Sequence, residues 1–570
     1  MNKASVAPQN RIHITYRTVS GDEKELPLKL MMLGDYTGLA DDVALADCNP
    51  VRIDKDNFDE VMRGFGPAAD ITVPNILSGK PGDKLALSMR FPTLSYFKPD
   101  ELVRQVPDMR ELVELREALG SGTEQRGDND TEHKARIAEI DRKLSAQLDE
   151  ILHHPKIQKL ESAWRGLKLV VDRTDFRENT QIVLLNASKE ALESDFERSP
   201  EIMRSGLHKH VYTAEYGVFG GEPFAAIIAN YEFGPNPRDI ALLQKVAAVS
   251  VIAHTPCIAA AGPEFFDIDT FPELPSKRDL KAIMEGPRYI RWRLFRDSED
   301  SRYVGLTLPR FLLRLPYGSY TNPVRSFDYQ ERVSDSHDHH LWGNTAFAFA
   351  TRLVDSFAKY RWCPNIIGLR SGGSVEDLPM HRLGTLEESQ TKIPTEIRIS
   401  ERNEYELAEE GFIVLATGAS GENAAFFSAN SVRRPRHFEP SAEGRAAEIS
   451  ERLATQLPYL FVITRLAHYV KVLYHENSRI WTSRSEIEFE LNKWINRYTA
   501  DMEIDHDAPR APRPLLQAGI EVSDAEHDPA CYRLSLWVRP LWKCMGTFFT
   551  LHLKGNLDKT EIPQGRGPGF

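Results

Sequence analysis

Three short runs near the start of the chain are strand-like, and the last of them alternates apolar and polar residues. These runs cover residues 11–16, 26–33 and 84–91. A period of two is typical of half-buried strands. Apolar residues at helical spacing follow Asp100, with Pro107 as the expected kink and Gly120 as the expected end of the helical pattern. Residues 1–119 are therefore predicted to form a small mixed domain.

A polar stretch then interrupts the pattern. Between Gly120 and Lys134 the sequence is GSGTEQRGDNDTEHK, which contains no strongly apolar residue. This composition is typical of a surface connection with little regular structure. Residues 120–135 are accordingly predicted to link a small and a large part of the chain.

The large part is predicted to cover residues 136–558. It opens with apolar residues on one helical stripe from Ile137 to Ile151, and strand-like and helical runs alternate after it. Near the end, strand-like alternation predicts a terminal β-hairpin around residues 531–553, followed by a tail at 559–570. The predicted fold class is therefore mixed α/β (α+β), in several parts.

Length and composition fit a large globular protein. The 570 residues exceed what one hydrophobic core usually supports. Apolar residues make up 41%, charged residues 27%, and a net charge of -12 is spread along the chain, which argues against general nucleic-acid binding. No apolar stretch reaches the roughly 18 uncharged residues of a membrane span, and residues 1–11 lack a signal core. We expect a cytoplasmic protein without membrane insertion.

Five cysteines show no CxxC spacing and are expected to be reduced packing residues. They are Cys48, Cys257, Cys363, Cys531 and Cys544. The segment DSHDHH at 335–340 holds the densest set of potential metal ligands. His337, His339 and His340 match no ligand pattern such as HExxH, so we predict an exposed polar loop and no bound metal.

Two further patterns also favour structural roles. The glycine segment at 370–374 is followed by no GK[ST] sequence, so a turn is predicted and no nucleotide site. Arg302, Arg310 and Arg314 alternate with apolar residues just after the acidic run at 297–300, which favours ion pairing over an anion site. No nucleophile with a base and an orienting acid can be assembled. The sequence therefore predicts no catalytic residue and no cofactor.

Longer segments resemble the two sheath subunits of the bacterial type VI secretion system. Those similar to the small subunit, the TssB or VipA family, are SVAPQNR at 5–11, LPLKLMMLG at 26–34, DKDNF at 54–58 and QVPDMRELVELREAL at 105–119. Those similar to the large subunit, the TssC or VipB family, include LESAWRGLK at 160–168, LWGNTAFAFATRL at 341–353 and QLPYLFVITRLAHYVKVL at 456–473. The two subunits are usually separate chains, and here both resemblances occur in one.

The resemblance implies a structural protomer of a contractile, phage-tail-sheath-like tube. Such protomers stack helically around an inner tube protein (Hcp-like) and contract to propel it toward a target cell. Implied partners are further copies of the chain, the inner tube, and baseplate and distal cap components. The implied location is the bacterial cytoplasm, docked to a membrane-anchored baseplate. A disassembly AAA+ ATPase of the ClpV type also acts on such sheaths, but the helical extension that usually carries its recognition segment is absent here.

Protomers of such sheaths are tied together by strands from chain ends, which is β-augmentation. The residues expected to pair between protomers are Arg11, Ile12, His13, Ile14, Thr15, Tyr16, Tyr532, Leu534, Leu536, Val538, Phe549, Leu551 and Leu553. The alternative class is a cytoplasmic enzyme or nucleotide-binding protein that uses the turn at Gly372 and Gly373 or the cluster around His337.

Overall fold

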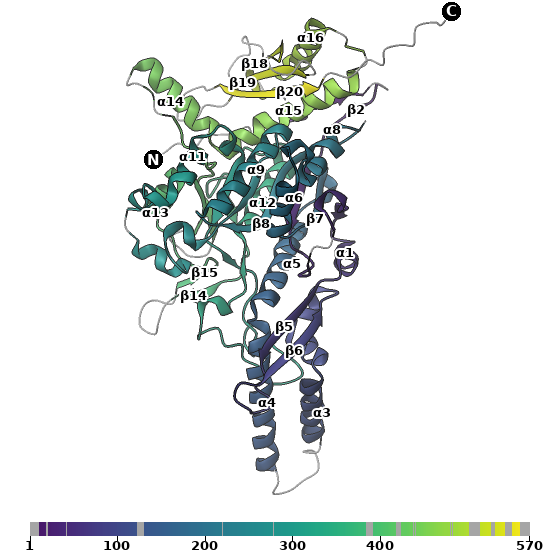
Figure 1. Ribbon diagram of the computed structural model, residues 1–570, viewed down its shortest axis with the longest axis vertical. Helices are drawn as coiled ribbons and strands as arrows, with labels where there is room; N and C mark the ends of the chain where they lie inside the picture. The colour runs from purple at the N-terminus through teal and green to yellow at the C-terminus, as the bar shows by residue number, and fades with distance from the viewer. Residues whose placement is uncertain are drawn as a thin grey trace, which may run out of the picture.

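The computed structural model describes most of the chain. The described residues are 11–18, 21–40, 43–121, 130–218, 220–277, 279–383, 391–417, 423–436, 438, 441–478, 480–481, 483–500, 513–525, 531–541 and 550–558. Figure 1 shows an elongated molecule with a broad middle part. A stalk formed by α3 (Pro107–Ser121) and α4 (Asp130–Leu152) projects from one end, and a small sheet covers the other.

A mixed sheet runs through the middle part. In spatial order its strands are β13 (Ser374–Val375), β17 (Ala424–Phe426), β16 (Phe412–Thr417), β10 (Val304–Leu308), β9 (Cys257–Ala261), β8 (Phe224–Phe233), β3 (Leu28–Gly34), β7 (Thr180–Asn186) and β4 (Val51–Ile53). Neighbouring strands from β16 to β7 are parallel, and the strands at either edge are antiparallel. The predicted mixed α/β class is confirmed.

Strand β3 comes from the predicted small part but lies inside the sheet of the large part. It pairs in parallel with β7 on one side and with β8 on the other. All seven of its residues are buried. Leu30 and Met32 belong to the core on one face of the sheet, whereas Met31 and Leu33 belong to the core on the other. The small part therefore has no separate core, and the two parts fold as one body.

Helices cover both faces of the sheet. On one face lie α5 (Pro155–Arg173) and α12 (Thr345–Tyr360), and on the other lies α9 (Pro237–Ala253). The side chain of Asn344 caps α12, and a proline occupies the first turn of α5. The two helices touch at Gly166, where an added Cβ would come within 2.3 Å of the Phe347 ring. Any larger residue at this position would push α5 away from α12.

The stalk occupies part of the predicted linker. Helix α3 continues to Ser121 and α4 already begins at Asp130, so the prediction of little regular structure is wrong for residues 120–121 and 130–134. Residues 122–129 lie outside the described part. The predicted break at Pro107 is confirmed, because α2 (Pro99–Gln105) ends just before it. Gln147 of α4 accepts a hydrogen bond from Ile76 N–H and donates one to Pro74 C=O, which fixes the stalk to the body.

The other helices and strands are shorter or lie outside the central sheet. The helices are α1 (Phe58–Phe65), α6 (Lys189–Arg198), α7 (Gly206–His208), α8 (Ala214–Tyr216), α10 (Leu280–Met284), α11 (Ile290–Asp297), α13 (Glu401–Glu409), α14 (Ala442–Ala454), α15 (Leu457–Asn477) and α16 (Arg484–Ile495). The strands are β1 (Tyr16–Arg17), β2 (Glu23–Lys24), β5 (Ala68–Pro74), β6 (Lys84–Arg90), β11 (Phe311–Leu312), β12 (Trp342–Gly343), β14 (His381–Leu383), β15 (Thr391–Ile393), β18 (Leu515–Asp524), β19 (Cys531–Pro540) and β20 (Leu551–Asp558).

Two sequence expectations concern residue chemistry. The cysteines within the described residues are free, and Cys257, Cys363 and Cys531 are buried as packing residues should be; Cys544 lies outside this part. Across the described helices, none combines the length and the apolar character needed to cross a membrane.

Candidate assembly interface

The last three strands form an antiparallel sheet at the end of the molecule opposite the stalk. Its order is β18, β19, β20 (Figure 1). The sequence predicted only the hairpin of β19 and β20, so β18 was missed. Alternate side chains of the sheet are buried toward α15 and α16, among them Leu534, Leu536, Leu551 and Leu553. The sheet therefore has one buried face and two edges, β18 and β20.

Strand β19 lies in the middle of this sheet. Its predicted pairing residues Tyr532, Leu534, Leu536 and Val538 are matched in register with β18 on one side and with β20 on the other. Both sides of β19 are therefore occupied within the same chain. Phe549, which was also predicted to pair between protomers, lies outside the described residues.

Strand β20 lies at an edge, and its register shows which backbone groups face outward. Both backbone groups of Ile520 in β18 bond to the side chain of Asn492, so they point away from β19. Because N–H and C=O directions alternate along a strand, the matched residues Leu536 and Leu553 then bond to each other. Leu551 and Leu553 consequently face β19 with their backbone groups.

The outward-facing residues of β20 are His552, Lys554 and Asn556. Their side chains are exposed, and no backbone hydrogen bond joins them to any described residue beyond β19. A row of unpaired N–H and C=O groups on an edge strand is a template for strand addition by another chain. The geometry thus provides an open edge at β20.

The predicted N-terminal strand is shorter than expected. Only Tyr16 and Arg17 pair as a strand, with β2, so the strand prediction is wrong for residues 11–15. Side chains alternate nonetheless: Ile12, Ile14 and Tyr16 are buried, whereas Arg11 and His13 are exposed. The alternation reflects an extended segment that lies on helices of its own chain.

Several backbone groups of this segment are occupied within the protomer. Ile12 N–H donates to Tyr360 C=O, and Ile14 C=O accepts from the Tyr469 hydroxyl. Thr15 C=O accepts from Trp494 and from Tyr498. Residues 11–16 therefore anchor the start of the chain to α15 and α16, close to the C-terminal sheet.

This anchoring predicts a loss of stability when the buried Ile14 side chain is shortened. Ile14 is only 1% exposed, so Ile14→Ala should lower the free energy of unfolding by about 2 to 5 kcal/mol. The adjacent exposed His13→Ala is the matched control and should change it by less than about 0.5 kcal/mol. Denaturant unfolding of both variants checks this. Equal stabilities would show that the segment does not pack on its own chain.

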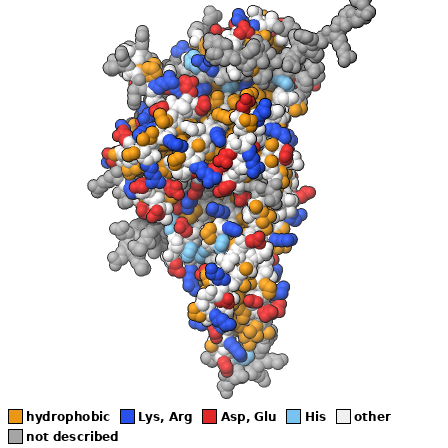
Figure 2. Space-filling model, viewed as in Figure 1, with side chains coloured by type: hydrophobic (Ala, Val, Ile, Leu, Met, Phe, Trp, Pro, Cys, Tyr) orange, Lys and Arg blue, Asp and Glu red, His pale blue; other side chains and the backbone are white. Residues whose placement is uncertain are grey.

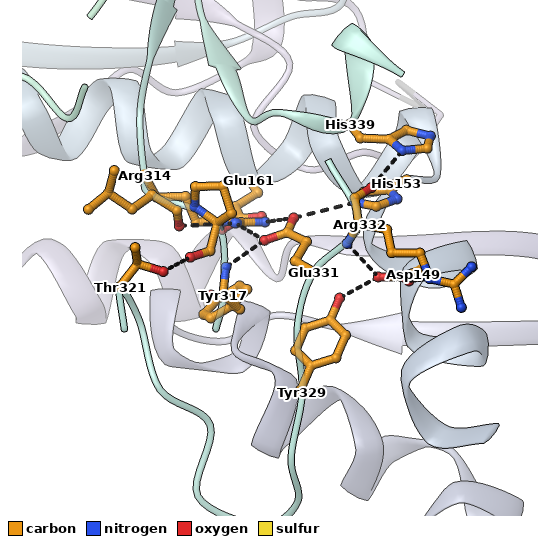
Figure 3. Close-up of polar contacts among 12 residues, drawn as sticks. Asp149, His153, Glu161, Arg314, Tyr317, Thr321, Tyr329, Glu331, Arg332 and His339 are labelled. Atoms are coloured by element: carbon orange, nitrogen blue, oxygen red, sulfur yellow. Dashed lines mark hydrogen bonds and ion pairs between the residues drawn. The ribbon is translucent and has the colours of Figure 1, made fainter. Parts of the chain in front are cut away.

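Two arginines of the candidate anion site, Arg310 and Arg314, form structural ion pairs. Arg310 makes two hydrogen bonds to Glu232, at 2.8 and 3.0 Å. Arg314 bonds to both carboxylate oxygens of Glu331, at 2.8 and 3.1 Å, and to Glu161 at 3.1 Å (Figure 3). The predicted ion pairing is confirmed for both, although their partners lie far from the acidic run at 297–300. Neither guanidinium is left to bind an anion.

The Arg314 network is buried and carries a pH prediction. Burial alone would raise the pKa of the Glu331 carboxyl, but Arg314, His153 and the Tyr317 N–H together lower it to about 2, from an ordinary 4.5. A lowered folded-state pKa contributes stability above about pH 4.5 that is lost as the pH falls toward 2. This part of the acid destabilisation should be absent in Glu331→Gln, as measured by unfolding between pH 5 and pH 2. An unchanged acid profile would contradict the pairing.

Removal of Arg314 tests the same network at neutral pH. Arg314→Met leaves the fully buried carboxylates of Glu161 and Glu331 without their main cation, so it should cost about 3 to 5 kcal/mol of stability. The exposed pair of Arg402 with Glu406 offers a matched control, because Arg402→Met should cost less than about 1 kcal/mol. Comparable losses in denaturant unfolding would contradict this account.

The histidines of the DSHDHH segment each face a different neighbour. His337 bonds to Glu396 at 2.9 Å, and the His339 ring stacks on His153 with centroids 4.0 Å apart. Burial and the neighbouring His381 and His337 lower the pKa of His340 to about 4, so it is neutral at pH 7. Among the residues that the structure describes, no group of three or more His, Cys, Asp or Glu is arranged to hold a metal ion.

The glycine turn packs against its own chain. Gly373 N–H donates to Gly368 C=O, and Gly373 C=O accepts from Phe426 N–H. Gly372 has a φ of +103°, and a Cβ there would come within 2.0 Å of the Asn365 carbonyl oxygen. Glycine is thus required by backbone conformation and close packing. The N–H of Gly373 is not available to a phosphate group.

The surface carries no large patch of one charge in the view of Figure 2. Basic and acidic side chains are interspersed over the visible face of the body and the stalk. A basic stripe of the kind that follows a nucleic-acid backbone is not seen on this face. The most distinctive feature for assembly therefore remains the open edge of β20.

Family models match nearly the whole chain. The model VipB (EvpB/VC_A0108, tail sheath N-terminal domain) matches residues 134–433, and VipB_2 (EvpB/VC_A0108, tail sheath gpW/gp25-like domain) matches 446–557. The model T6SS_VipA (type VI secretion system, VipA, VC_A0107 or Hcp2) matches residues 4–153. The VipA and VipB matches overlap at residues 134–153, which include most of the stalk helix α4.

Two curated relatives are sheath proteins. The chain is 38% identical to the type VI secretion system sheath protein TssC1 of Pseudomonas aeruginosa, covering 75% of this chain and 86% of that protein. It is 29% identical to the sheath protein TssB1 of the same organism, covering 20% of this chain and 67% of that protein.

Two solved sheaths are also similar to parts of the chain. A chain of the VipA-N2/VipB contracted sheath of the type VI secretion system is 39% identical over 21% of this chain and 99% of that chain, with a TM-score of 0.17. The helical sheath of the anti-feeding prophage in its contracted state is 10% identical over 70% and 79%, with a TM-score of 0.30. From the family models and TssC1, the chain belongs to the type VI secretion tail sheath family, as a structural subunit of the contractile sheath that joins a VipA-like and a VipB-like region in one polypeptide.

Proposed function

We propose that copies of this chain assemble helically around an Hcp-like inner tube, and that contraction of the sheath propels this tube toward a target cell. The single observation that carries the assembly step is the open edge of β20 at His552, Lys554 and Asn556. In a sheath protein, an unpaired edge strand can link two copies when a neighbouring copy adds a strand to it.

The donor in this proposal is the N-terminal segment of a neighbouring copy, which includes residues 11–16. Its addition to β20 requires Ile12, Ile14 and Thr15 to exchange the backbone hydrogen bonds that they make within their own chain. His13 is exposed in this segment, and neither of its backbone groups bonds to another described residue. Each added backbone hydrogen bond contributes roughly 0.5 to 1.5 kcal/mol net, so a short added strand contributes a few kcal/mol per link. Repetition around a helix of many protomers makes such links sufficient, and they can persist while rigid bodies rotate.

The residues that the alternative enzyme or nucleotide-binding function would use make structural contacts within the chain. The His337 ring is bonded to Glu396, and the Gly373 backbone is bonded within the chain. Both features of the alternative enzyme or nucleotide-binding function thus have structural partners. We infer that the chain acts by assembly and not by catalysis.

Membership of the sheath family supports a proposal for partners and location. We infer that the sheath works in the bacterial cytoplasm, docked to a membrane-anchored baseplate and closed by a distal cap. Recycling by a ClpV-type ATPase is not part of the proposal, because the helical extension that usually carries the recognition segment is absent between α3 and the opening of the large part.

Electron microscopy of the purified full chain tests this function. Long hollow tubes are expected at micromolar concentration, and sedimentation should place most of the protein in large particles. Protein that stays monomeric under all conditions, or monomers that turn over a substrate, would overturn the proposal.

A further inference from the structure

The C-terminal sheet has a second edge, β18, and helix α16 lies along it. Ile487, Leu491 and Ile495 of α16 are buried beside the sheet and account for the packing of the helix. Two polar residues of the same helix, Glu488 and Asn492, contact the strand in a different way. They bond to its backbone and not to its side chains.

Asn492 imitates a neighbouring strand. Its side-chain Oδ1 accepts from Ile520 N–H at 3.0 Å, and its Nδ2 donates to Ile520 C=O at 2.6 Å. A side-chain amide offers a donor and an acceptor in the same arrangement as a peptide group. The Asn492 Nδ2 also donates to the Glu488 carbonyl oxygen at 2.8 Å, and this second bond fixes the orientation of the amide.

Two more contacts extend the cover along the strand. Glu488 Oε2 accepts from Val522 N–H at 3.1 Å, and Ala500 N–H donates to Leu515 C=O at 2.7 Å. Along the outer side of β18, the Leu515 C=O, the Val522 N–H and both backbone groups of Ile520 therefore have hydrogen-bond partners. Ala518 lies between them and bonds to none of the described residues on that side.

We propose that Glu488 and Asn492 close the β18 edge, so that neighbouring copies can add a strand only at β20. The inference rests on the proposed assembly by strand addition and specifies its direction. A sheet with two open edges could capture strands from two neighbours and would link copies irregularly. With one edge closed, each C-terminal sheet accepts one strand, which favours regular tubes.

Packing alone does not explain these residues. A leucine at position 492 would pack as well beside Leu491 and Ile495, but it would leave the Ile520 N–H and C=O without partners. Burial of unpaired backbone groups is costly, and an open edge invites strand addition. The side chains of Glu488 and Asn492 thus supply hydrogen-bond partners for the backbone groups of this edge from within the same chain.

The test uses a full-length chain whose β20 edge is blocked by Lys554→Pro, which removes an outward N–H. This variant is expected to remain monomeric in sedimentation. Adding Asn492→Leu with Glu488→Ala should open the β18 edge and raise the sedimenting fraction at least about tenfold. The matched control adds Leu491→Ala instead, which loosens the packing of α16 but keeps both edge contacts; it should stay monomeric.

The outcomes separate the inference from the proposed function. If the β18-opened variant stays as monomeric as the Leu491→Ala control, the inference is overturned and the proposed function stands. If Lys554→Pro alone still forms normal tubes, the proposed strand addition at β20 is overturned, and with it the inference that depends on it. If circular dichroism shows that the opened variant is unfolded, amide hydrogen exchange of the Lys554→Pro monomer tests whether the β18 edge is closed. Slow exchange at Ile520 and Val522 with fast exchange at His552 and Asn556 supports closure, and equally fast exchange at all four overturns it.

Discussion

A chain cut within residues 122–129 is expected to remain one complex, whereas neither half should fold when produced alone. The reason is the position of β3 between β7 and β8. Its side chains from Leu28 to Leu33 are buried in the cores of both sheet faces. At roughly 1.5 to 3 kcal/mol for each large apolar side chain, five of them contribute about 8 to 15 kcal/mol. This matches the whole stability of a typical domain, about 5 to 15 kcal/mol.

The measurement is direct. A protease site is placed between residues 122 and 129, and the cleaved protein is compared with the uncut protein of the same sequence by gel filtration and circular dichroism. Co-elution of the two pieces with unchanged ellipticity is expected. A piece covering residues 130–570 that is folded and soluble on its own would show that β3 is dispensable.

Closing the β20 edge should abolish tubes without unfolding the protomer. In Lys554→Pro the ring removes an outward N–H and blocks an incoming strand, while the bonds of Leu553 and Gly555 to β19 are kept. The loss of a few kcal/mol per link should raise the concentration needed for assembly at least about tenfold, since 1.4 kcal/mol corresponds to a factor of ten. Electron microscopy and sedimentation at several concentrations measure this.

Lys554→Ala is the matched control for this variant. It removes the same exposed charge but retains the N–H, so tubes should form normally. Thermal unfolding of both variants shows whether the protomer is intact. Tubes of normal length from Lys554→Pro would rule out the β20 edge as the assembly site, and loss of tubes in both variants would assign the effect to the lysine side chain.

Local patterns predicted elements well but not their partners. The alternation of Ile12, Ile14 and Tyr16 correctly indicated an extended segment with one buried side, yet the same pattern suits a strand and a segment lying on helices. The residues that receive it are Tyr469 of α15, Trp494 of α16 and Tyr498 just after α16, more than 450 positions away. Contacts over such separations are not encoded in any local window.

The position of β3 shows the same limit. The apolar run at 26–33 predicted a strand, but pairing with Thr180 and Phe224 depends on the register of distant strands. A continuous apolar run is consistent with an inner strand, but the run does not show which strands pair with it. The arginine pairs are similar: ion pairing was predicted correctly, whereas Glu232 and Glu331 were not identified as partners.

Strand β18 had a signal that could have been used. Ala518, Ile520 and Val522 alternate with Gln517, Glu521 and Ser523, which is the pattern of a half-buried strand. The edge contacts of Asn492 and Glu488 had none, because polar residues on a helix usually face solvent. Only the structure shows that both point at the backbone of β18.

The most direct test of the account is a map, at side-chain resolution, of the assembly formed by the full chain. We expect a hollow helical tube in which a strand from another copy hydrogen-bonds to His552, Lys554 and Asn556, while β18 is covered by its own chain, through α16 and Ala500. A tube whose copies leave the β20 edge bare, or a preparation without any helical assembly, would contradict it.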